Sequence, residues 1–444
     1  MSQKIKPRIY KGTRDFLPEQ MIKRQFVINH IERIFKKYGF EALETPTMEL
    51  WETLSGKYGE EADRLTYRFT DRGDREVGLR YDLTVPLSRV VASYPHIPKP
   101  FKRYQIQPVW RADKPQKGRF REFYQCDIDV IGSASMLAEA EILAAIYEIL
   151  KVLGFDQFLM RINSRKILRG IAEVSGISPE QEGTMARAID KFDKIGLEGV
   201  KSELIKSGIN AAKTKALLEK LGSSGTNSQR ITDAEKYLKE SDTGIQGLEE
   251  LKKLFHFLQI YEIPEEYLIF DLFLARGLDY YTGPIFETFV REPQIGSITG
   301  GGRYDNLIGM FSGTDYPATG CSIGLERIIT VMEELDMFPE YLKTPIQALV
   351  TVFEASTLDY SIDIARKLRA AHINTELYTG ESKLRGQFGL ANDKSIPLVI
   401  IAGPDEIENQ QFNLKNMRTG EQSTHLLEDL IMRVQEILNT LHSE

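Results

Sequence analysis

The stretch from residue 101 to residue 132, FKRYQIQPVW RADKPQKGRF REFYQCDIDV IG, decides the fold of this chain. Two segments that alternate apolar and polar residues, FKRYQIQPVWRAD and REFYQCDIDVIG, flank the polar loop KPQKGRF. Such a pair predicts a long antiparallel hairpin. Alternation places Gln125, Asp127 and Asp129 on one face of its second strand. Burying these polar side chains without a bonding partner is costly, so this face suits a polar, cationic ligand such as an amino acid. A solvated sheet face is the alternative.

The segments before and after the hairpin predict a helix, a strand and a second helix. Residues 19–38 carry apolar side chains at helical spacing, and Gly39 ends that helix. The segment FEALETP, residues 40–46, is typical of a strand closed by Pro46. Residues 65–70 alternate and RGDREVG behaves as a hairpin connection, while residues 135–152 return to a helical period with Ser135 as the expected cap.

Two later regions differ in character from the first 169 residues. From about 170 to 262 the chain is a series of helical segments, with a flexible link expected near 222–229, and strand patterns resume at 268–291. In the last hundred residues, strands at 346–353, 373–379 and 397–403 alternate with helices at 357–372, 381–394 and 427–441. This alternation predicts a separate α/β domain with a mostly parallel or mixed sheet, beginning near residues 343–345.

Length and composition limit the class of protein. A chain of 444 residues is too long for one core, and 42% hydrophobic with 27% charged residues is an ordinary globular balance. Two distant cysteines build no disulfide framework, and the sequence shows neither an apolar leader nor a run of membrane-spanning length, so we expect a cytoplasmic protein without a membrane partner. The net charge of −7 argues against a protein that coats DNA, but not against a local nucleic-acid contact.

The candidate chemistry lies in arginines and carboxylates. The sequence has no GxxxxGK[ST] loop, GxGxxG, HExxH or GxSxG motif, and its six histidines are scattered, so no metal-ligand set is predicted. Arginines instead occupy strand-like or glycine-rich surroundings, namely Arg111, Arg119, Arg121, Arg276 and Arg327. A guanidinium keeps its charge and matches phosphate geometry, which points to phosphoryl or nucleotidyl transfer; a surface ion pair is the alternative for each one.

These residues carry a family resemblance. The helix, the strand and Pro46, then WRADKPQKGRFREF, then GCSIGLER resemble motifs one, two and three of class II aminoacyl-tRNA synthetases. The segments LARGLDYYTGPIFE and GGGRYDNLIG resemble two segments peculiar to histidyl-tRNA synthetases, and they occur in the right order. The resemblance covers nearly the whole chain.

The resemblance implies an α+β fold with an antiparallel sheet core flanked by helices. Residues 1–169 and 263–342 would form the catalytic core, residues 170–262 an inserted helical domain, and residues 343–444 an anticodon-binding α/β domain. It also implies a homodimer whose interface uses motif one. The reaction would activate L-histidine with ATP, accompanied by Mg²⁺, to histidyl-adenylate and transfer the histidyl group to the 3′ end of tRNA(His).

Site residues are carried over position by position. ATP would contact Arg111, Asp113, Arg119, Phe123 and Arg327, with Phe123 stacking on adenine and Asp113 standing where the family usually has glutamate. Histidine would contact the set Asp82, Leu83, Thr84, Arg111, Gln125, Asp129, Arg276, Tyr280 and Tyr281. Arg276 and Arg111 are the predicted catalytic residues, both at the α-phosphate. Gln116 and Lys117 would meet the tRNA acceptor end, and Lys383, Arg385 or Asn392 the anticodon.

Three other interpretations compete with this one. A noncatalytic regulator related to histidyl-tRNA synthetases would have lost the arginine-bearing segment and the C-terminal domain, and this chain keeps both. A synthetase for threonine, proline or glycine would not carry LARGLDYY and GGGRYDN. A purely structural or binding role leaves the set of arginines and carboxylates unexplained.

Overall fold

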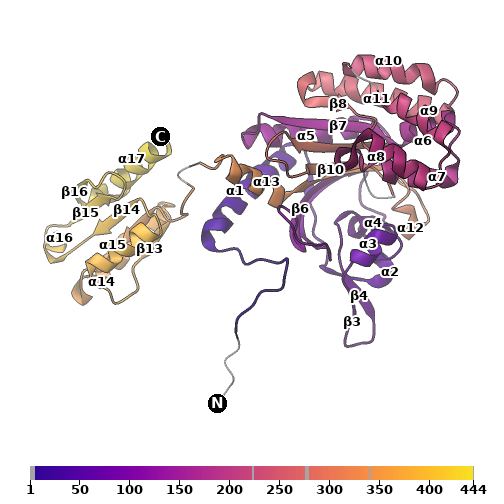
Figure 1. Ribbon diagram of the computed structural model, residues 1–444. Helices are drawn as coiled ribbons and strands as arrows, with labels where there is room; N and C mark the ends of the chain where they lie inside the picture. The colour runs from indigo at the N-terminus through magenta and orange to yellow at the C-terminus, as the bar shows by residue number, and fades with distance from the viewer. Residues whose placement is uncertain (1–5, 223–224, 276–279, 340–341, 444) are drawn as a thin grey trace. The chain divides into compact units, whose positions relative to one another are not determined.

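The computed structural model describes residues 6–222, 225–275, 280–339 and 342–443, which include all the helices and strands named below. Its contacts divide the chain into two compact units (Figure 1). Unit 1 comprises the residues up to Asp15 and Phe26–Met337, and unit 2 comprises Phe16–Gln25 and Phe338–Glu444. None of the described helices has the length and apolar character needed to cross a membrane.

Unit 1 is built on an eight-stranded sheet with the order β1-β5-β6-β11-β10-β9-β7-β8. Its strands are β1 (Glu41–Ala42), β5 (Phe101–Trp110), β6 (Glu122–Ile131), β7 (Phe158–Ser164), β8 (Leu268–Phe270), β9 (Pro284–Val290), β10 (Ser297–Arg303) and β11 (Ala318–Gly324). The pairs from β5 to β7 are antiparallel, and the two edge pairs β1·β5 and β7·β8 are parallel. The hairpin predicted for residues 101–132 is therefore confirmed as β5 and β6.

Helices and a small second sheet complete unit 1. The small sheet has the order β2-β4-β3, from β2 (Met48–Leu50), β3 (Arg68–Thr70) and β4 (Glu76–Leu79). The helices beside the two sheets are α1 (Pro18–Lys37, shared with unit 2), α2 (Trp51–Leu54), α3 (Glu60–Leu65), α4 (Thr84–Ser93), α5 (Leu137–Val152), α12 (Gly309–Ser312) and α13 (Leu325–Glu334). Helix α5 covers one face of the large sheet, where its Glu139 accepts a 2.7 Å hydrogen bond from Arg303 of β10. The opposite face is left for the candidate site.

The predicted helical insertion is present. It consists of α6 (Arg165–Val174), α7 (Pro179–Ile189), α8 (Phe192–Lys206), α9 (Ala211–Leu221), α10 (Asn227–Leu238) and α11 (Asp242–Ile260), followed by a 3-10 turn at Glu265–Tyr267. These helices cluster beside β7 and β8 (Figure 1). The flexible link predicted at 222–229 is wrong over its second half, because Thr226 and Gln229 form a capping box that starts α10 at Asn227.

Two further local predictions fail for identifiable reasons. Ser135 is not the cap of α5, since the helix begins at Leu137 after Met136, although the Ser135 hydroxyl accepts a 3.2 Å hydrogen bond from the Leu137 amide. The strand predicted for residues 40–46 pairs only at Glu41 and Ala42. Beyond it, the Arg80 guanidinium takes the place of a partner strand and donates to the carbonyl oxygens of Thr45 at 2.6 Å and Pro46 at 3.3 Å.

Unit 2 is a five-stranded sheet in the order β13-β12-β14-β15-β16. Its elements are β12 (Ala348–Val350), α14 (Leu358–Ala370), β13 (Thr375–Leu377), α15 (Leu384–Asp393), β14 (Leu398–Ile401), α16 (Pro404–Glu408), β15 (Gln411–Asn416), β16 (Gln422–Leu426) and α17 (Leu430–Ser443), with 3-10 turns at Ala355–Thr357 and Leu427–Asp429. The first three strands are parallel and the last two antiparallel, so the prediction of a mixed α/β sheet is confirmed.

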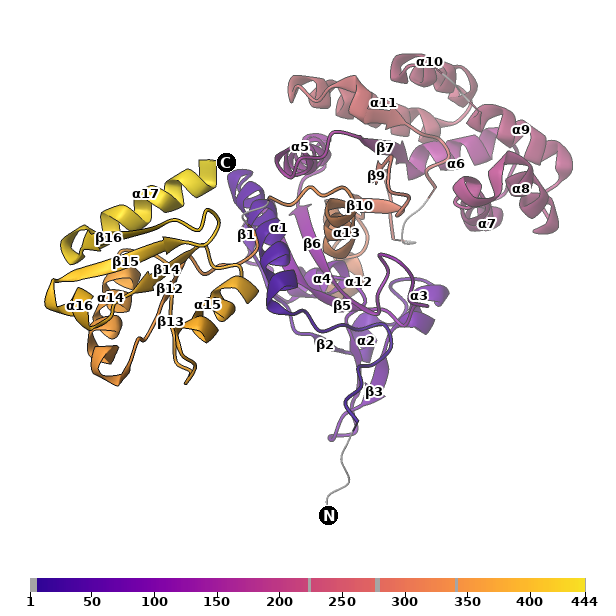
Figure 2. The same cartoon turned by 60° about the vertical axis from the view of Figure 1, so that its left-hand side comes forward.

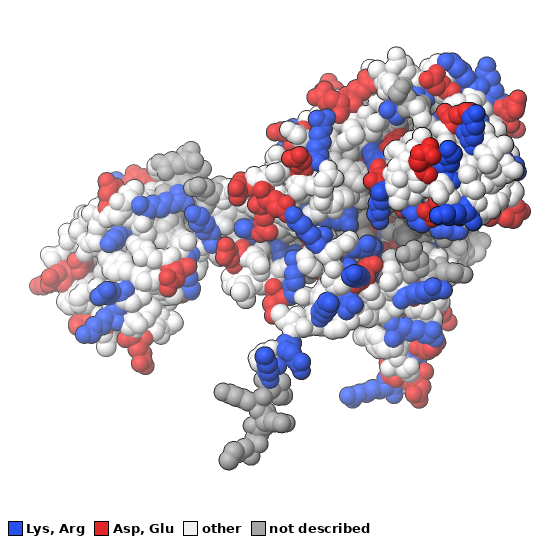
Figure 3. Space-filling model, viewed as in Figure 1, with Lys and Arg blue, Asp and Glu red and all other residues white. Residues whose placement is uncertain are grey.

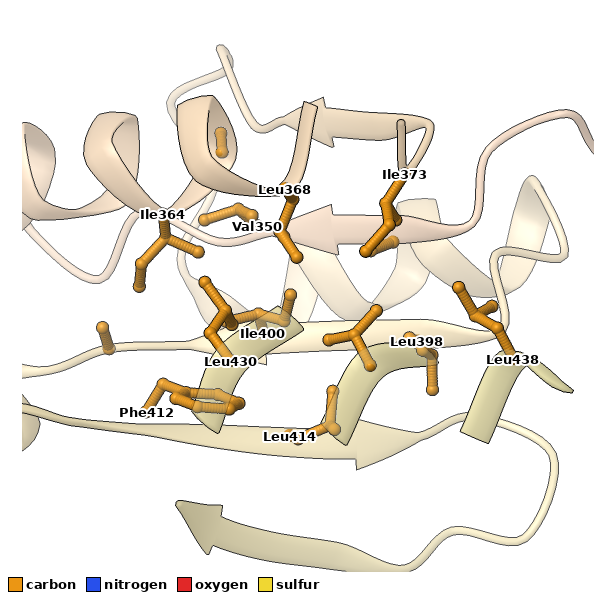
Figure 4. Close-up of a cluster of buried hydrophobic side chains, with 14 residues drawn as sticks. Val350, Ile364, Leu368, Ile373, Leu398, Ile400, Phe412, Leu414, Leu430 and Leu438 are labelled. Carbon is orange, nitrogen blue, oxygen red and sulfur yellow. The ribbon is translucent and has the colours of Figure 1, made fainter. Parts of the chain in front are cut away.

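Helices cover both faces of this second sheet (Figure 2). Side chains of α14 and α17, such as Leu368 and Leu430, pack with Val350, Ile400 and Phe412 on one face (Figure 4). Helix α15 lies against the other face, where Ala391 packs with Leu349 and Val399. Because successive strand residues point to opposite faces, a strand covered on both sides is apolar throughout, which explains the run LVII in β14.

Candidate active site

The uncovered face of the large sheet carries the polar residues that alternation predicts. In the β5·β6 and β6·β11 registers, Asp129 of β6 lies between Arg103 and Gly320. Asp127 lies beside Ser322 in the same way, and Gln125 beside Gly324. The Gln125 amide nitrogen is 3.5 Å from the Asp127 carboxylate and 2.7 Å from the Ser322 hydroxyl. The central strands thus form a floor of long polar side chains next to glycine and serine.

Gly320 makes room for the Asp129 side chain. A Cβ atom built at Gly320 would lie 1.9 Å from Oδ1 of Asp129, closer than any real contact, so no larger residue fits while Asp129 holds its place. At Gly300, on the neighbouring strand β10, a Cβ would meet nothing nearer than Glu287 at 3.7 Å. One glycine is thus required by the protein's own packing, whereas the other leaves the floor open.

A cleft of about 400 Å³ lies over this floor. That volume is within the range of small-molecule sites. Its lining includes most of the residues predicted to bind histidine or ATP: Asp82, Thr84, Arg111, Asp113, Arg119, Phe123, Gln125, Asp129, Tyr280, Tyr281 and Arg327. Residues that are far apart in the sequence therefore meet around one cavity.

Asp82 lies at the start of α4 and is almost completely buried. Its carboxylate accepts hydrogen bonds from the Tyr58 hydroxyl at 3.1 Å, the Tyr280 hydroxyl at 3.2 Å and the Val85 amide at 3.0 Å. Burial raises the pKa of Asp82, while the Val85 amide and the Arg111 charge oppose the rise. Three donors therefore fix the orientation of this carboxylate at the cleft wall.

Asp129 is fixed in a comparable way. The buried Arg103 guanidinium lies 2.7 Å from one of its oxygens, and the Tyr304 hydroxyl donates to the other. Burial raises the pKa of Asp129 and the Arg103 charge lowers it. Sequence reasoning missed Arg103, Tyr304 and Tyr58 as parts of the site. Tyr304 belongs to the segment GGGRYDN, so a usable sequence signal existed for that residue.

The arginines of the cleft are positioned by neighbouring aromatic and backbone groups. The Arg111 guanidinium donates to the Tyr81 carbonyl at 3.0 Å and lies over the Tyr81 and Phe123 rings, 4.3 and 5.1 Å from their centroids. Arg119 forms a 2.9 Å ion pair with Asp113. Arg327, at the start of α13, donates to the Ser297 carbonyl. A cationic wall therefore faces the carboxylates of the floor.

Three of the described residues that were predicted for the site do not line the cleft. The Leu83 side chain is fully buried, and only its carbonyl oxygen approaches the polar floor, accepting from Arg103 at 3.4 Å. Gln116 and Lys117 are exposed on the loop between β5 and β6, where Lys117 pairs with Glu334 at 2.7 Å. Arg276 lies outside the described residues.

The antiparallel sheet with its polar cleft, together with the second α/β unit, defines a class II aminoacyl-tRNA synthetase with an anticodon-binding domain. The family model described as histidyl-tRNA synthetase matches residues 12–328, and the one described as anticodon binding domain matches residues 347–437. The chain belongs to the histidyl-tRNA synthetase family.

Individual relatives agree with this assignment. The histidine–tRNA ligase of Cytophaga hutchinsonii is 42% identical over 97% of this chain and 99% of its own length. That of Gloeobacter violaceus is 44% identical over 93% and 94%. The crystal structure of histidyl-tRNA synthetase from a Nostoc species superposes with a TM-score of 0.87 at 31% identity, covering 98% of this chain and 100% of that one.

The function of the chain follows from the family and these relatives. It is a histidine–tRNA ligase, with histidine, ATP and tRNA(His) as substrates. A synthetase for another amino acid and a noncatalytic regulator are therefore no longer alternatives.

Proposed function

We propose that histidine and ATP bind side by side in the cleft over β6 and β11, and that the chain's own arginines promote attack of histidine on the α-phosphate. The observation that supports this proposal is the meeting of the two predicted residue sets around one cavity of about 400 Å³. A reaction between two bound substrates gains most of its rate from such positioning and from charge neutralisation.

The histidine half of the cleft would surround the floor of β6. Asp129, Gln125 and Tyr281 bond the imidazole nitrogens, while Asp82 and Thr84 face the α-ammonium group. Leu83 contributes through its backbone, because its side chain is buried. A pocket that bonds both ring nitrogens rejects apolar side chains of the same size, since its own buried polar groups would lose their partners.

The ATP half would use the arginine wall. Phe123 stacks on adenine, Arg111 contacts the α-phosphate, and Arg119 and Arg327 contact the outer phosphates. Asp113 accepts from the adenine amino group through a side chain one methylene shorter than the usual glutamate. Asp113 pairs with Arg119 at 2.9 Å, so ATP binding would exchange this ion pair for contacts with the nucleotide.

The reaction would proceed in two transfers. A carboxylate oxygen of histidine attacks the α-phosphorus, a new P–O bond forms, and pyrophosphate leaves with the bonding electrons. Arg111 and Arg276 balance the negative charge that grows on the phosphoryl oxygens. A hydroxyl of the 3′-terminal ribose of tRNA then attacks the histidyl carbonyl carbon, and AMP leaves. The place of Arg276 in this scheme rests on its sequence segment alone.

Mg²⁺ would accompany ATP. Among the described residues no group of three His, Cys, Asp or Glu side chains could hold a metal ion. This fits an ion that keeps several waters and is held mainly by phosphates with one or two carboxylates. Glu287, on the part of the floor nearest Gly300, is the cleft carboxylate that we assign to this contact.

The tRNA acceptor end would reach the cleft along a basic surface. A second hollow of about 600 Å³ shares Tyr280 and Tyr281 with the cleft, and its lining includes Arg165, Lys166 and Arg169 of α6 and Arg187 of α7. Lys and Arg side chains also gather on the face of unit 1 shown in Figure 3. Cations of this kind bind the phosphate backbone, while Gln116 and Lys117 stay exposed for the terminal bases.

The remaining assignments are also proposals. Residues 1–169 and 263–342 form the catalytic core, residues 170–262 the insertion and residues 343–444 the anticodon-binding domain of a cytoplasmic enzyme. The homodimer would use the surface after Pro46, where Met48, Leu50 and Phe69 expose large apolar side chains on the three-stranded sheet. A monomeric mass in sedimentation velocity at micromolar concentration would argue against the dimer.

Substitution of Arg276 by alanine tests the catalytic assignment. We expect an Arg276→Ala chain with an unchanged melting temperature and a histidine-dependent pyrophosphate exchange rate lower by roughly 10²-fold or more, because one preorganised charge is lost at the α-phosphate. Arg366→Ala, which removes an exposed arginine of unit 2, is the control and should keep the wild-type rate. Unchanged exchange in Arg276→Ala would refute the role.

A further inference from the structure

Asp127 is a buried ionisable group at the cleft for which the reaction outlined above has no use. It lies between Gln125 and Asp129 on the same face of β6, only 3% exposed, and it lines the cleft. Its strand neighbours are Gln105 on β5 and Ser322 on β11. With the imidazole ring across Gln125 and Asp129, as proposed above, Asp127 would lie beneath the bound substrate. The ammonium group, at Asp82 and Thr84, would be within electrostatic reach of Asp127, because the Asp82 and Asp127 charges already interact.

The nearest cation to Asp127 is Arg103, which is shared with a second carboxylate. Nη2 of Arg103 lies 2.7 Å from Asp129 but 4.0 Å from Asp127, so Asp129 is the better-paired group. Nε and Nη1 of Arg103 make no hydrogen bond with the residues that the structure describes. The other ionisable groups that face Asp127 are Asp82, Tyr281, Cys321 and the more distant Arg80. The floor therefore carries more acidic than basic groups.

This shortage of positive charge affects the protonation of Asp127 near neutral pH. Burial raises its pKa to about 7, the Arg103 charge opposes the rise, the Asp129 charge adds to it, and a hydrogen bond from Ser322 lowers it. A cation placed above the floor favours the ionised carboxylate. Binding of a cationic group and loss of the Asp127 proton should then be linked.

We propose that Asp127 is a further determinant of histidine binding. Its carboxylic acid loses its proton to solvent when the α-ammonium group of histidine binds. Arg103 is the positioning residue that holds Asp127 and Asp129 under the substrate. The inference rests on the proposed placement of histidine above β6. It adds a requirement for a cationic amino group to the recognition of the imidazole ring. A histidine analogue without the cationic amino group would not promote ionisation of Asp127.

The sign of the pH dependence follows from this linkage. Binding is tightest when Asp127 is ionised, so the histidine KM of the wild-type chain should fall as pH rises towards 7.5 and then level off. Substitution by asparagine keeps the volume and the hydrogen-bonding capacity but removes the charge. We therefore expect Asp127→Asn to raise the histidine KM roughly tenfold at pH 8, a loss typical of one charged contact, with little change at pH 6 and with kcat and the ATP KM unchanged.

The number of protons released on histidine binding would not change if Asp127 had only a structural role. Histidine binding is measured by titration calorimetry near pH 7 in two buffers of different ionisation enthalpy. The wild-type chain should release a fraction of one proton, and Asp127→Asn should release less, the contribution of the free histidine ring being common to both. Glu139→Gln, which alters the buried Glu139–Arg303 pair on the other face of the sheet, should behave as the wild-type chain.

A second variant keeps the proposal testable if Asp127→Asn does not fold. Ser322→Ala removes the hydroxyl that favours the ionised carboxylate, so the pH midpoint of the histidine KM should move upwards. Proton release and pH profiles identical in the wild-type chain, Asp127→Asn and Ser322→Ala would overturn the inference while leaving the ligase assignment intact. Absence of histidine-dependent exchange in the wild-type chain would instead overturn the proposed function.

Discussion

The central strands of unit 2 bury only apolar side chains, such as Leu349, Val350 and Val399, whereas the central strands of unit 1 bury Arg103, Asp127 and Asp129. Both sets of side chains are almost completely excluded from solvent. In unit 2 each buried apolar group adds to the free energy of unfolding at roughly 25 cal/mol per Å². In unit 1 the buried charges are costly unless they are paired and hydrogen-bonded.

The difference shows where each sheet obtains its stability and its function. The five-stranded sheet is complete without a ligand, because its two apolar faces are covered by helices of the same unit. The floor of the eight-stranded sheet has one face covered by the chain and one face that a polar substrate would complete. We infer that stability and activity can be changed separately in the two units.

The largest expected effect is on the stability of unit 2. Phe412 of β15 is fully buried in the apolar cluster that the sheet shares with α14 and α17, so Phe412→Ala should destabilise that unit by about 3–5 kcal/mol. Differential scanning calorimetry should show the change, and Phe412→Leu should show a smaller one. Histidine-dependent pyrophosphate exchange, a reaction of unit 1, should keep its rate, while tRNA charging falls. Loss of exchange in Phe412→Ala would show that the two units are not separable.

Much of the fold could be predicted from periodicity because the strongest patterns are local. The alternation of FKRYQIQPVW and EFYQCDIDVI is long enough to identify β5 and β6, and α14 and α17 have clear apolar faces. The hairpin of β15 and β16 was not predicted. In β16 every residue is at least partly exposed, so its sequence QSTHL has no buried face to produce an apolar period.

The site could be predicted in part, and the missing residues share a physical reason. Gln125, Asp127 and Asp129 follow from alternation on one strand. Tyr58 contacts Asp82 from a segment with no motif, and only the packing of that segment brings the two side chains within 3.1 Å. Arg103 carries its charge inside a strand, where a single sequence does not distinguish a buried guanidinium from an exposed one. The motifs, by contrast, are short enough to be found without knowing the fold.

A matched pair of glycine substitutions sharpens the comparison within the floor itself. Gly320→Ala should displace Asp129, because its Cβ would lie 1.9 Å from Oδ1. We expect the histidine KM to rise at least about tenfold, as for loss of a hydrogen bond to a charged group, with the ATP KM unchanged. Gly300→Ala, whose Cβ has no neighbour within 3.7 Å, should fold normally and change the histidine KM less. Equal effects in both variants would mean that Asp129 does not contact the substrate.

The smallest effect is expected at the surface of unit 2, where apolar packing plays no part. Lys383 and Arg385 are exposed at the beginning of α15, and cations near a helix N-terminus favour contact with phosphate. The double variant Lys383→Glu with Arg385→Glu should raise the tRNA KM roughly fivefold and reduce its salt dependence, since each lost phosphate contact lowers the slope by about one. Pyrophosphate exchange without tRNA should not change.

The control for this last prediction is a pair with the same change of charge. Arg366→Glu with Lys367→Glu alters α14, where both side chains pair with Asp363. If this control raises the tRNA KM as much as the α15 variant, the net charge of unit 2 matters and the position does not. If neither variant changes it, the anticodon contacts lie elsewhere. If only the α15 variant raises the tRNA KM, the tRNA contact of unit 2 depends on the exposed cations Lys383 and Arg385. The buried apolar side chains of unit 2 would then contribute to its stability alone.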